Sequence, residues 1–442
     1  MRTFAISAVV MLTAAISASP AAFALTPPQV DRLFVPADGR PSPDQPMRQS
    51  TECATAIAPA DAARPAAGFT MLNVAEAWKY SRGQGVSVAV IDTGVTPNPR
   101  LLAQPGGDYI TGGDGLSDCD AHGTIVASVI AAQPGTSDGV VGVAPEATLI
   151  SIRQSSRAFG GAHETPGTVA TLARAIVHAA DLGAQVINVS VTACMPAVEP
   201  LDQRAIGAAV WYAATVKDAV VVAAAGNEGE EGCVQNPTLD PLNPVDPRDW
   251  AHVKTISSPS WFSDYVLSAG AVTPAGEPMD QSLAGPWLGV AAPGTGVMGL
   301  SPQNGAPVDA YPPMRPGDKS IPFWGTSFSA AYVSGVAALV RAKFPTLTAH
   351  QVVNRIVQTA HNPARGVDNR IGYGVVDPVA ALTFAVPSAD RGAPGGQSRP
   401  LTPPAAAAAP DHRSRDAAIA IAGIFVVGAL LAPLLTLARR AR

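Results

Sequence analysis

The chain has 442 residues, which is enough for one large domain or two ordinary ones. Only 14% of the residues are charged, and the formal net charge is −5. These values exclude the dense basic surface that nucleic-acid binding needs, so we expect no nucleic-acid partner.

Apolar segments at both ends of the chain indicate export and membrane anchoring. Residues 1–24 are typical of a signal peptide, because Arg2 precedes a short apolar core and Ala22-Phe23-Ala24 has the small-x-small form of a cleavage site. Residues 417–438 form an apolar run long enough to span a bilayer, and the basic tail 439–442 follows. The alternatives are an uncleaved anchor at the start and a buried soluble helix at the end. We expect a single-pass cell-membrane protein whose main domain lies outside the cytoplasm.

Two segments flank the expected domain at residues 71–385. Residues 25–70 contain Pro, Ala and isolated charges with little periodicity, which is consistent with a propeptide, a disordered leader or an extension held on the domain. Residues 386–414 are rich in Pro, Ala and Gly and are predicted to be a linker.

The expected domain alternates strand-like and helix-like patterns. Nearly continuous apolar runs predict buried strands at 86–91, 148–152, 185–191, 219–225 and 266–272. Helical patterns lie at 122–132, 169–182, 204–214 and 349–359, a capped helical turn at 73–78, and a long helix after Gly325-Thr326-Ser327. This alternation predicts an α/β fold with a mostly parallel central sheet and helices on both faces, plus one C-terminal transmembrane helix. Long loops with functional roles are expected at 104–120, 226–247 and 301–322.

Four cysteines fall in the exported part, where disulfides persist. Four cysteines allow three pairings. We favour Cys53–Cys119, which would attach the N-terminal extension to the domain, and Cys194–Cys233, which would hold the 226–247 loop. No Cys-x-x-Cys spacing indicates a zinc site.

Four polar residues at glycine-flanked turns suggest acyl-transfer chemistry. Asp92 ends a predicted strand, His122 opens a helix, Asn227 follows another strand, and Ser327 opens the long helix. Ser327 would attack a carbonyl, His122 would take its proton, and Asp92 would orient the imidazole. Asn227 and the Ser327 N–H would donate to the oxyanion. Each residue alone is weak evidence, because each has an ordinary structural role at such a turn. Together, in the order Asp, His, Ser, they predict a serine endopeptidase.

These motifs resemble those of the subtilase family of serine proteases. Asp92-Thr93-Gly94, His122-Gly123-Thr124, Gly226-Asn227 and Gly325-Thr326-Ser327 match its site segments, and Val141–Pro145 and Ala291–Gly294 match other landmarks. The resemblance implies a subtilisin-like fold and the triad roles given above. Calcium is common in subtilases, and Asp114, Asp118 and Asp120 are the nearest candidate ligands, but we expect no metal and no cofactor.

The layout of signal peptide, cysteine-bearing extension, subtilase domain, linker and C-terminal anchor is similar to that of the mycosins. That resemblance implies cleavage of secreted proteins, bound as extended peptide segments, and association with membrane components of a type VII secretion system. Alternatives are a mainly structural component of that system and a general envelope protease. The sequence departs from subtilases at Ala331, where a proline is usual, and at Val189–Thr192, which replaces the usual Ser-Leu-Gly wall of the specificity pocket.

Overall fold

The computed structural model describes residues 25–387, except 161–165, 199–200, 231, 239–241, 243–244, 314, 316 and 365. The predicted signal peptide, nearly all of the predicted linker and the predicted transmembrane segment lie outside the described residues. In the part of the chain that is described, no helix is long and apolar enough to cross a membrane.

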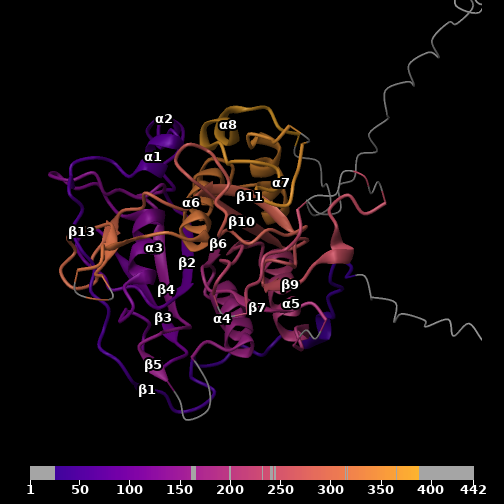
Figure 1. Cartoon of the computed structure of the whole chain (residues 1–442), viewed down its shortest axis with the longest axis horizontal. Coiled ribbons are helices and arrows are strands. Elements are labelled where there is room, and N and C mark those ends of the chain that lie inside the picture. The colour runs from indigo at the N-terminus through magenta and orange to yellow at the C-terminus, as the bar shows by residue number, and fades with distance from the viewer. Residues whose placement is uncertain are drawn as a thin grey trace, which may run out of the picture. The chain divides into compact units, whose positions relative to one another are not determined.

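A parallel β-sheet with helices on both faces forms the centre of the domain (Figure 1). Within the described residues this sheet has seven strands in the order β11-β10-β8-β6-β2-β4-β3, and all neighbours are parallel. The predicted three-layer α/β architecture is therefore confirmed. The strands are β2 (Ser87–Asp92), β3 (Ala103–Asp108), β4 (Thr148–Arg153), β6 (Val186–Val189), β8 (Val220–Ala224), β10 (Val266–Val272) and β11 (Leu288–Pro293).

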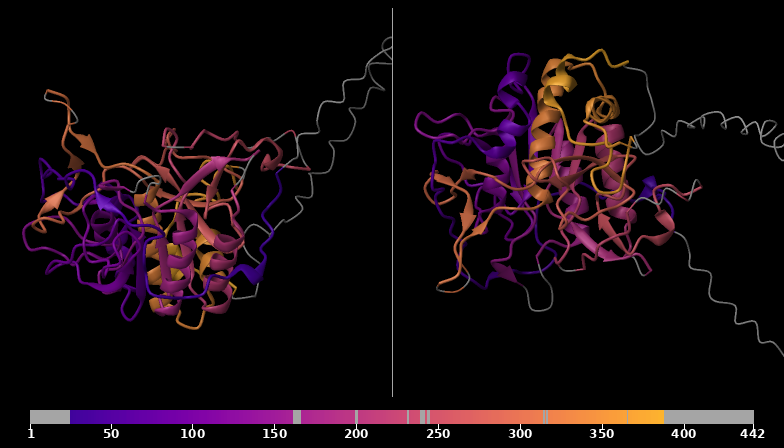
Figure 2. Two further views of the ribbon diagram at one scale, coloured as in Figure 1. Left: turned by 90° about the horizontal axis from the view of Figure 1, so that it is seen from below. Right: turned by 45° about the horizontal axis from the view of Figure 1, so that its top comes forward.

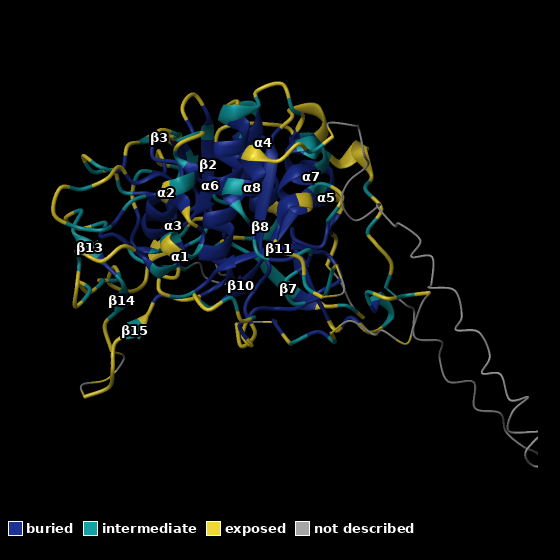
Figure 3. Cartoon of the chain, turned by 90° about the horizontal axis from the view of Figure 1, so that it is seen from above, coloured by how far each residue is buried: buried dark blue, intermediate teal, exposed yellow. Residues whose placement is uncertain are grey.

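The two faces of the sheet build separate hydrophobic clusters. Side chains alternate along a strand, so Val88 and Val90 of β2 pack with α3 and α6, whereas Ala89 and Ile91 pack with α4 and α5. Helix α6 is buried from Thr326 to Arg341, and Figure 3 shows it in the buried colour among the strands. The helices are α1 (Ala67–Met71), α2 (Val74–Ala77), α3 (His122–Ala131), α4 (Val169–Asp181), α5 (Arg204–Trp211), α6 (Thr326–Lys343), α7 (Ala349–Thr359) and α8 (Pro378–Thr383).

Short elements complete the described part of the chain. Antiparallel pairs join β1 to β5, β7 to β9, β12 to β13 and β14 to β15. Their bounds are β1 (Arg48–Gln49), β5 (Phe159–Gly160), β7 (Ala193–Pro196), β9 (Thr255–Ser258), β12 (Gly299–Leu300), β13 (Pro307–Val308), β14 (Ala310–Tyr311) and β15 (Ile321–Pro322). Single helical turns lie at Arg32–Phe34 (η1), Tyr212–Val216 (η2) and Trp250–His252 (η3).

Three local predictions were wrong. The stretch 104–120 was predicted to be a loop, but it begins with the edge strand β3. An edge strand tolerates Pro105, because one side of the strand needs no hydrogen-bond partner. The register shift between Pro105 and Asp108 accommodates the two intervening glycines. The predicted 301–322 loop contains the short strands β13, β14 and β15. The helical turn expected at 73–78 forms as α2, but the predicted cap is wrong, because the Asn73 side chain makes no capping hydrogen bond and its backbone is left-handed.

The N-terminal extension lies along the surface of the domain. Figure 2 shows this indigo segment passing along the outside of the magenta helices. Asp44 forms a salt bridge of 2.5 Å with Arg174 of α4, and β1 pairs with β5 near the end of β4. Farther on, the Ile57 N–H donates to the Ala310 carbonyl at 2.8 Å. The extension therefore joins the helical layer to the segment that precedes α6.

Candidate active site

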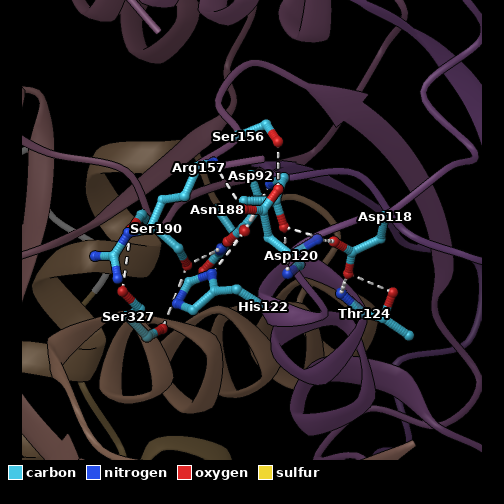
Figure 4. Close-up of polar contacts among 12 residues, drawn as sticks. Asp92, Asp118, Asp120, His122, Thr124, Ser156, Arg157, Asn188, Ser190 and Ser327 are labelled. Atoms are coloured by element: carbon cyan, nitrogen blue, oxygen red, sulfur yellow. Dashed lines mark hydrogen bonds and ion pairs between the residues drawn. The ribbon is translucent and has the colours of Figure 1, made fainter. Parts of the chain in front are cut away.

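Asp92 and His122 meet at the carboxyl edge of the sheet. Asp92 ends β2 and is fully buried, and His122 is the first residue of α3. Asp92 Oδ1 lies 2.7 Å from His122 Nδ1 and also accepts the Thr93 N–H at 2.7 Å. In Figure 4 the imidazole lies between Asp92 and Ser327. Because the carboxylate holds Nδ1, it orients the imidazole and leaves Nε2 as the ring nitrogen available to a reactant.

A close backbone approach makes this pair possible. A Cβ atom at position 123 would lie 2.1 Å from the Gly94 carbonyl oxygen and 3.1 Å from Asp92 Oδ1. Only glycine fits there, which is the physical reason for the His-Gly pair. Ala121, directly before the histidine, has a left-handed backbone with φ 63°, which is uncommon for a residue with a Cβ atom.

The surroundings of His122 make its imidazole more basic. Burial lowers the pKa of His122, but the charge and hydrogen bond of Asp92 raise it, and the charges of Asp118 and Glu230 act in the same direction. The net effect is a pKa above the ordinary value. Such an imidazole is a stronger general base in its neutral form.

Ser327 lies in the first turn of α6, where unpaired backbone N–H groups and the helix dipole favour negative charge. Its hydroxyl donates to the Ser190 carbonyl at 3.0 Å, and the Ser190 hydroxyl donates to the Ser327 carbonyl at 3.3 Å. Behind this pair, Asn188 donates to the Ser190 hydroxyl and accepts from Ser334 of α6. The network holds the segment after β6 against the start of α6. Sequence reasoning missed Asn188 and Ser334, because nothing local distinguishes them from ordinary buried polar residues.

Asn227 is also tied to the start of α6. Its Oδ1 accepts the Thr326 N–H at 3.0 Å and the Thr326 hydroxyl at 3.2 Å. The Gly226 N–H in turn donates to the Thr326 hydroxyl at 3.1 Å. Because Oδ1 accepts a backbone N–H, the amide orientation is determined and the Nδ2 donor points away from Thr326. Among the described residues Nδ2 makes no hydrogen bond, which leaves it available to a ligand.

The acidic residues considered as calcium ligands are hydrogen-bonded to protein donors. Asp118 accepts from Thr93 and Thr124, and Asp120 accepts from the Ser156 hydroxyl and the Arg157 N–H. Asp114 Oδ1 accepts the Leu116 N–H within its own turn. Within the described residues no group of acidic, histidine and cysteine side chains is arranged to hold a metal ion.

Both favoured cysteine pairs have their sulfur atoms at bonding distance. The S–S distance is 2.03 Å for Cys53–Cys119 and 1.98 Å for Cys194–Cys233. Cys119 lies three residues before His122, and the Cys194 sulfur is 3.4 Å from where a Cβ of Gly226 would lie. One bridge therefore adjoins the histidine side of the site and the other adjoins the asparagine side.

Residues 83–374 match the model of the subtilase family, also called peptidase S8. The chain therefore belongs to the subtilase family, and it is a subtilisin-like serine protease.

Its relatives place it more narrowly, among proteins of the mycosin type. Mycosin-2 of Mycobacterium tuberculosis is 53% identical, with 100% of this chain and 98% of the relative covered. A solved structure of "a serine protease MycP1, an essential component of the type VII (ESX-1) secretion system" is 49% identical, has a TM-score of 0.78 and covers 81% of this chain and 100% of that chain. A chain of an intact ESX-5 inner membrane complex is 50% identical, has a TM-score of 0.78 and covers 93% of this chain and 100% of that chain. The predicted resemblance to subtilases and mycosins is confirmed.

Proposed function

We propose that this chain is an extracytoplasmic, membrane-tethered serine endopeptidase that cleaves secreted proteins, with Asp92, His122 and Ser327 as its catalytic triad. The observation that carries this proposal is the 2.7 Å contact between Asp92 and His122 at the sheet edge, with Ser327 at the start of α6 beside the imidazole in Figure 4. An acid, a base and a hydroxyl nucleophile are the groups that nucleophilic acyl transfer needs, which supports the proposal.

The triad would act by moving one proton. In the first step the Ser327 hydroxyl leaves the Ser190 carbonyl, gives its proton to His122 Nε2 and attacks the scissile carbonyl carbon. The Asp92 carboxylate stabilises the imidazolium that forms. His122 then returns the proton to the leaving amine as the peptide bond breaks. Water attacks the acyl-enzyme in the same way and restores the Ser327 hydroxyl. Hydrogen bonds of such sites often tighten only when substrate binds.

Asn227 would supply a donor for the oxyanion. Its Nδ2 is held by the Thr326 contacts to Oδ1, and the Ser327 N–H at the helix start would be the second donor. A preorganised donor of this kind stabilises the tetrahedral intermediate without reorganisation during the reaction.

The substrate would bind as an extended peptide beside Asn227 and Ser327. Val191 and Thr192 follow β6 at this edge, are partly exposed, and make no backbone hydrogen bond to another described residue. Such a segment can pair with an added strand, so that main-chain hydrogen bonds hold the peptide in register.

A serine-directed fluorophosphonate probe tests the enzymatic part of this proposal. We expect the purified protein to be labelled on Ser327 and the Ser327→Ala variant to remain unlabelled. Ser329→Ala is the matched control, because Ser329 lies on the same helix and its hydroxyl donates to the Ala292 carbonyl. Absence of labelling in the folded wild-type protein would contradict the proposal.

A second role in a secretion membrane complex is supported by the relatives. Similar chains have been solved within ESX-5 inner membrane assemblies, and this chain has an extension attached along its surface. We propose that this protein also stabilises a type VII secretion membrane complex. Complementation of a null strain with Ser327→Ala separates the roles: restored secretion would show that the structural role is sufficient, and absent secretion at normal protein levels would show that cleavage is required.

Membrane attachment is proposed to depend on residues 417–438. Truncation after residue 416 should move the protein from the membrane fraction to the soluble extracytoplasmic fraction while fluorophosphonate labelling persists. Retention of the truncated protein in washed membranes, in a strain lacking the secretion complex, would contradict anchoring by this segment.

A further inference from the structure

A buried carboxylate, Asp118, lies behind the Asp–His pair and is not one of the triad residues. The residue is 6% exposed. Oδ1 accepts the Thr93 hydroxyl at 2.8 Å and the Asp120 N–H at 3.1 Å. Oδ2 accepts the Thr124 N–H at 2.8 Å and the Thr124 hydroxyl at 2.6 Å. Burial of a carboxylate is unfavourable unless donors of this kind stabilise it.

The donors of Asp118 come from the two segments that carry the pair. Thr93 directly follows Asp92 at the end of β2, and Thr124 lies in the first turn of α3, two residues after His122. The Thr93 hydroxyl also accepts the Gly123 N–H at 2.9 Å. Asp118 and Thr93 therefore connect the turn after β2 to the start of α3. Figure 4 shows the contact between Asp118 and Thr124.

We propose that Asp118 is a positioning residue of the protease: through its hydrogen bonds with Thr93 and Thr124 it holds the start of α3 against the end of β2. This inference rests on the proposed triad function. Asp118 makes no contact with a substrate in this scheme and acts only through its neighbours.

Charged and titratable groups face Asp118 from three elements. Asp92 faces it from β2, His122 from α3, and Tyr311 from β14. Asp120 follows on its own segment. Burial raises the pKa of Asp118, the hydrogen bonds from Thr124 and Thr93 oppose this rise, and the charge of Asp92 adds to it; the net result is a pKa of about 6. Burial, together with the charges of Asp118 and Asp92, raises the pKa of Tyr311, so its phenol stays neutral at working pH.

Two consequences follow for Asp118→Asn. An amide has one acceptor oxygen, so a buried N–H or hydroxyl donor loses its partner and the start of α3 shifts. A displacement of about 1 Å in such a site lowers the rate by about 10²-fold. Loss of the charge also lowers the pKa of His122, so the acid limb of the pH profile moves to lower pH.

The test measures the rate of Ser327 labelling by a fluorophosphonate between pH 4.5 and 9 for wild type and three variants. For Asp118→Asn we expect a plateau lower by about 10–100-fold and an acid limb at lower pH. Asp120→Asn is the matched control two residues away; its carboxylate binds Ser156 and Arg157, so plateau and limb should stay near wild type. Thr93→Val breaks the connection but keeps the Asp118 carboxyl group, so it should lower the plateau.

Several results would overturn the inference while leaving the proposed function intact. If wild type is labelled and Asp118→Asn has the same pH profile of labelling, Asp118 has no role in the reaction. Equal limb shifts in Asp118→Asn and Asp120→Asn show an unspecific charge effect. If Asp118→Asn does not fold, Thr93→Val decides: a wild-type plateau overturns the positioning role. Absent labelling of wild type contradicts the proposed function itself.

Discussion

Asn227 is oriented by the residue that precedes Ser327, although 99 residues separate Asn227 from Thr326 in the chain: Asn227 Oδ1 accepts the Thr326 N–H at 3.0 Å. The start of α6 therefore presents Ser327 and also sets the direction in which the Asn227 amide donates. The proposed nucleophile, Ser327, and the proposed oxyanion donor, Asn227, are held by a single hydrogen-bonded unit, so disturbance of Thr326 should affect both.

Replacement of Asn227 should reduce turnover more than binding. For Asn227→Ala we expect kcat to fall about 10²–10³-fold with KM nearly unchanged, as for loss of the corresponding donor in subtilisin. Thr326→Val keeps the backbone N–H but removes the hydroxyl, so we expect kcat to fall by about tenfold or less. Steady-state hydrolysis of a peptide substrate measures both. A change in KM alone for Asn227→Ala would argue against an oxyanion role.

The pH profile should respond to Glu230. Its charge helps to raise the pKa of His122. In the proposed mechanism His122 acts in its neutral form, which is lost as the pH falls through that pKa. Glu230→Gln should therefore lower the pKa and extend activity to lower pH. Because the Glu230 side chain is exposed, at 41%, the shift of the His122 pKa should shrink at high salt. Glu76→Gln, on the surface helix α2, is the control and should leave the profile unchanged. If the acid limb of the Glu230→Gln profile moved to higher pH, the conclusion that the Glu230 charge raises the pKa of His122 would be wrong.

Gly123 should not tolerate a methyl group. A Cβ atom there would lie 2.1 Å from the Gly94 carbonyl oxygen, so α3 must move away from β2 and the Asp92–His122 contact must lengthen. We expect Gly123→Ala to lower labelling of Ser327 by about 10²-fold or more and stability by about 1–3 kcal/mol. Gly39→Ala, where a Cβ meets nothing within 4 Å, should be neutral in both measurements. If Gly123→Ala were labelled at the wild-type rate, the close approach of residue 123 to the Gly94 carbonyl would be contradicted.

The Cys53–Cys119 bridge should contribute to stability through the extension. It closes a segment of 66 residues, so Cys53→Ser with Cys119→Ser should cost about 2–4 kcal/mol. Thermal unfolding measures the loss, and limited proteolysis within residues 25–57 should become faster. The comparison pair is Cys194→Ser with Cys233→Ser, which adjoins Gly226 and should reduce activity as well as stability. Unchanged proteolysis of the extension would show that its other contacts suffice to hold it.

The long apolar segments could be predicted from the sequence almost to the residue. Strand β10 and helix α7 have the predicted bounds 266–272 and 349–359, because a buried strand and an amphipathic helix each carry a periodicity that does not depend on distant residues. The edge strand β3 could not be predicted. Pro105 and the glycines after it oppose a strand locally, and only pairing with β4 overcomes that preference.

In the candidate site, too, some residues could be predicted from the sequence and others only from the tertiary structure. Asp92, His122, Asn227 and Ser327 could be selected from the sequence, because each stands where a strand ends or a helix begins. Asp118 could not be interpreted, because its donors Thr93 and Thr124 belong to separate segments; from the sequence alone it was only a candidate metal ligand.

The sequence by itself thus determined the class of the protein, the buried strands and long helices of its core and the chemical types of the candidate reactive groups, since these depend on local backbone preference and burial pattern. Only the tertiary structure decided which side chains meet. The parallel sheet brings the carboxyl ends of β2, β6 and β8 to one edge, and the start of α6 meets them there. Distances between such segments depend on packing of the whole core and therefore leave no signal in any single stretch of residues.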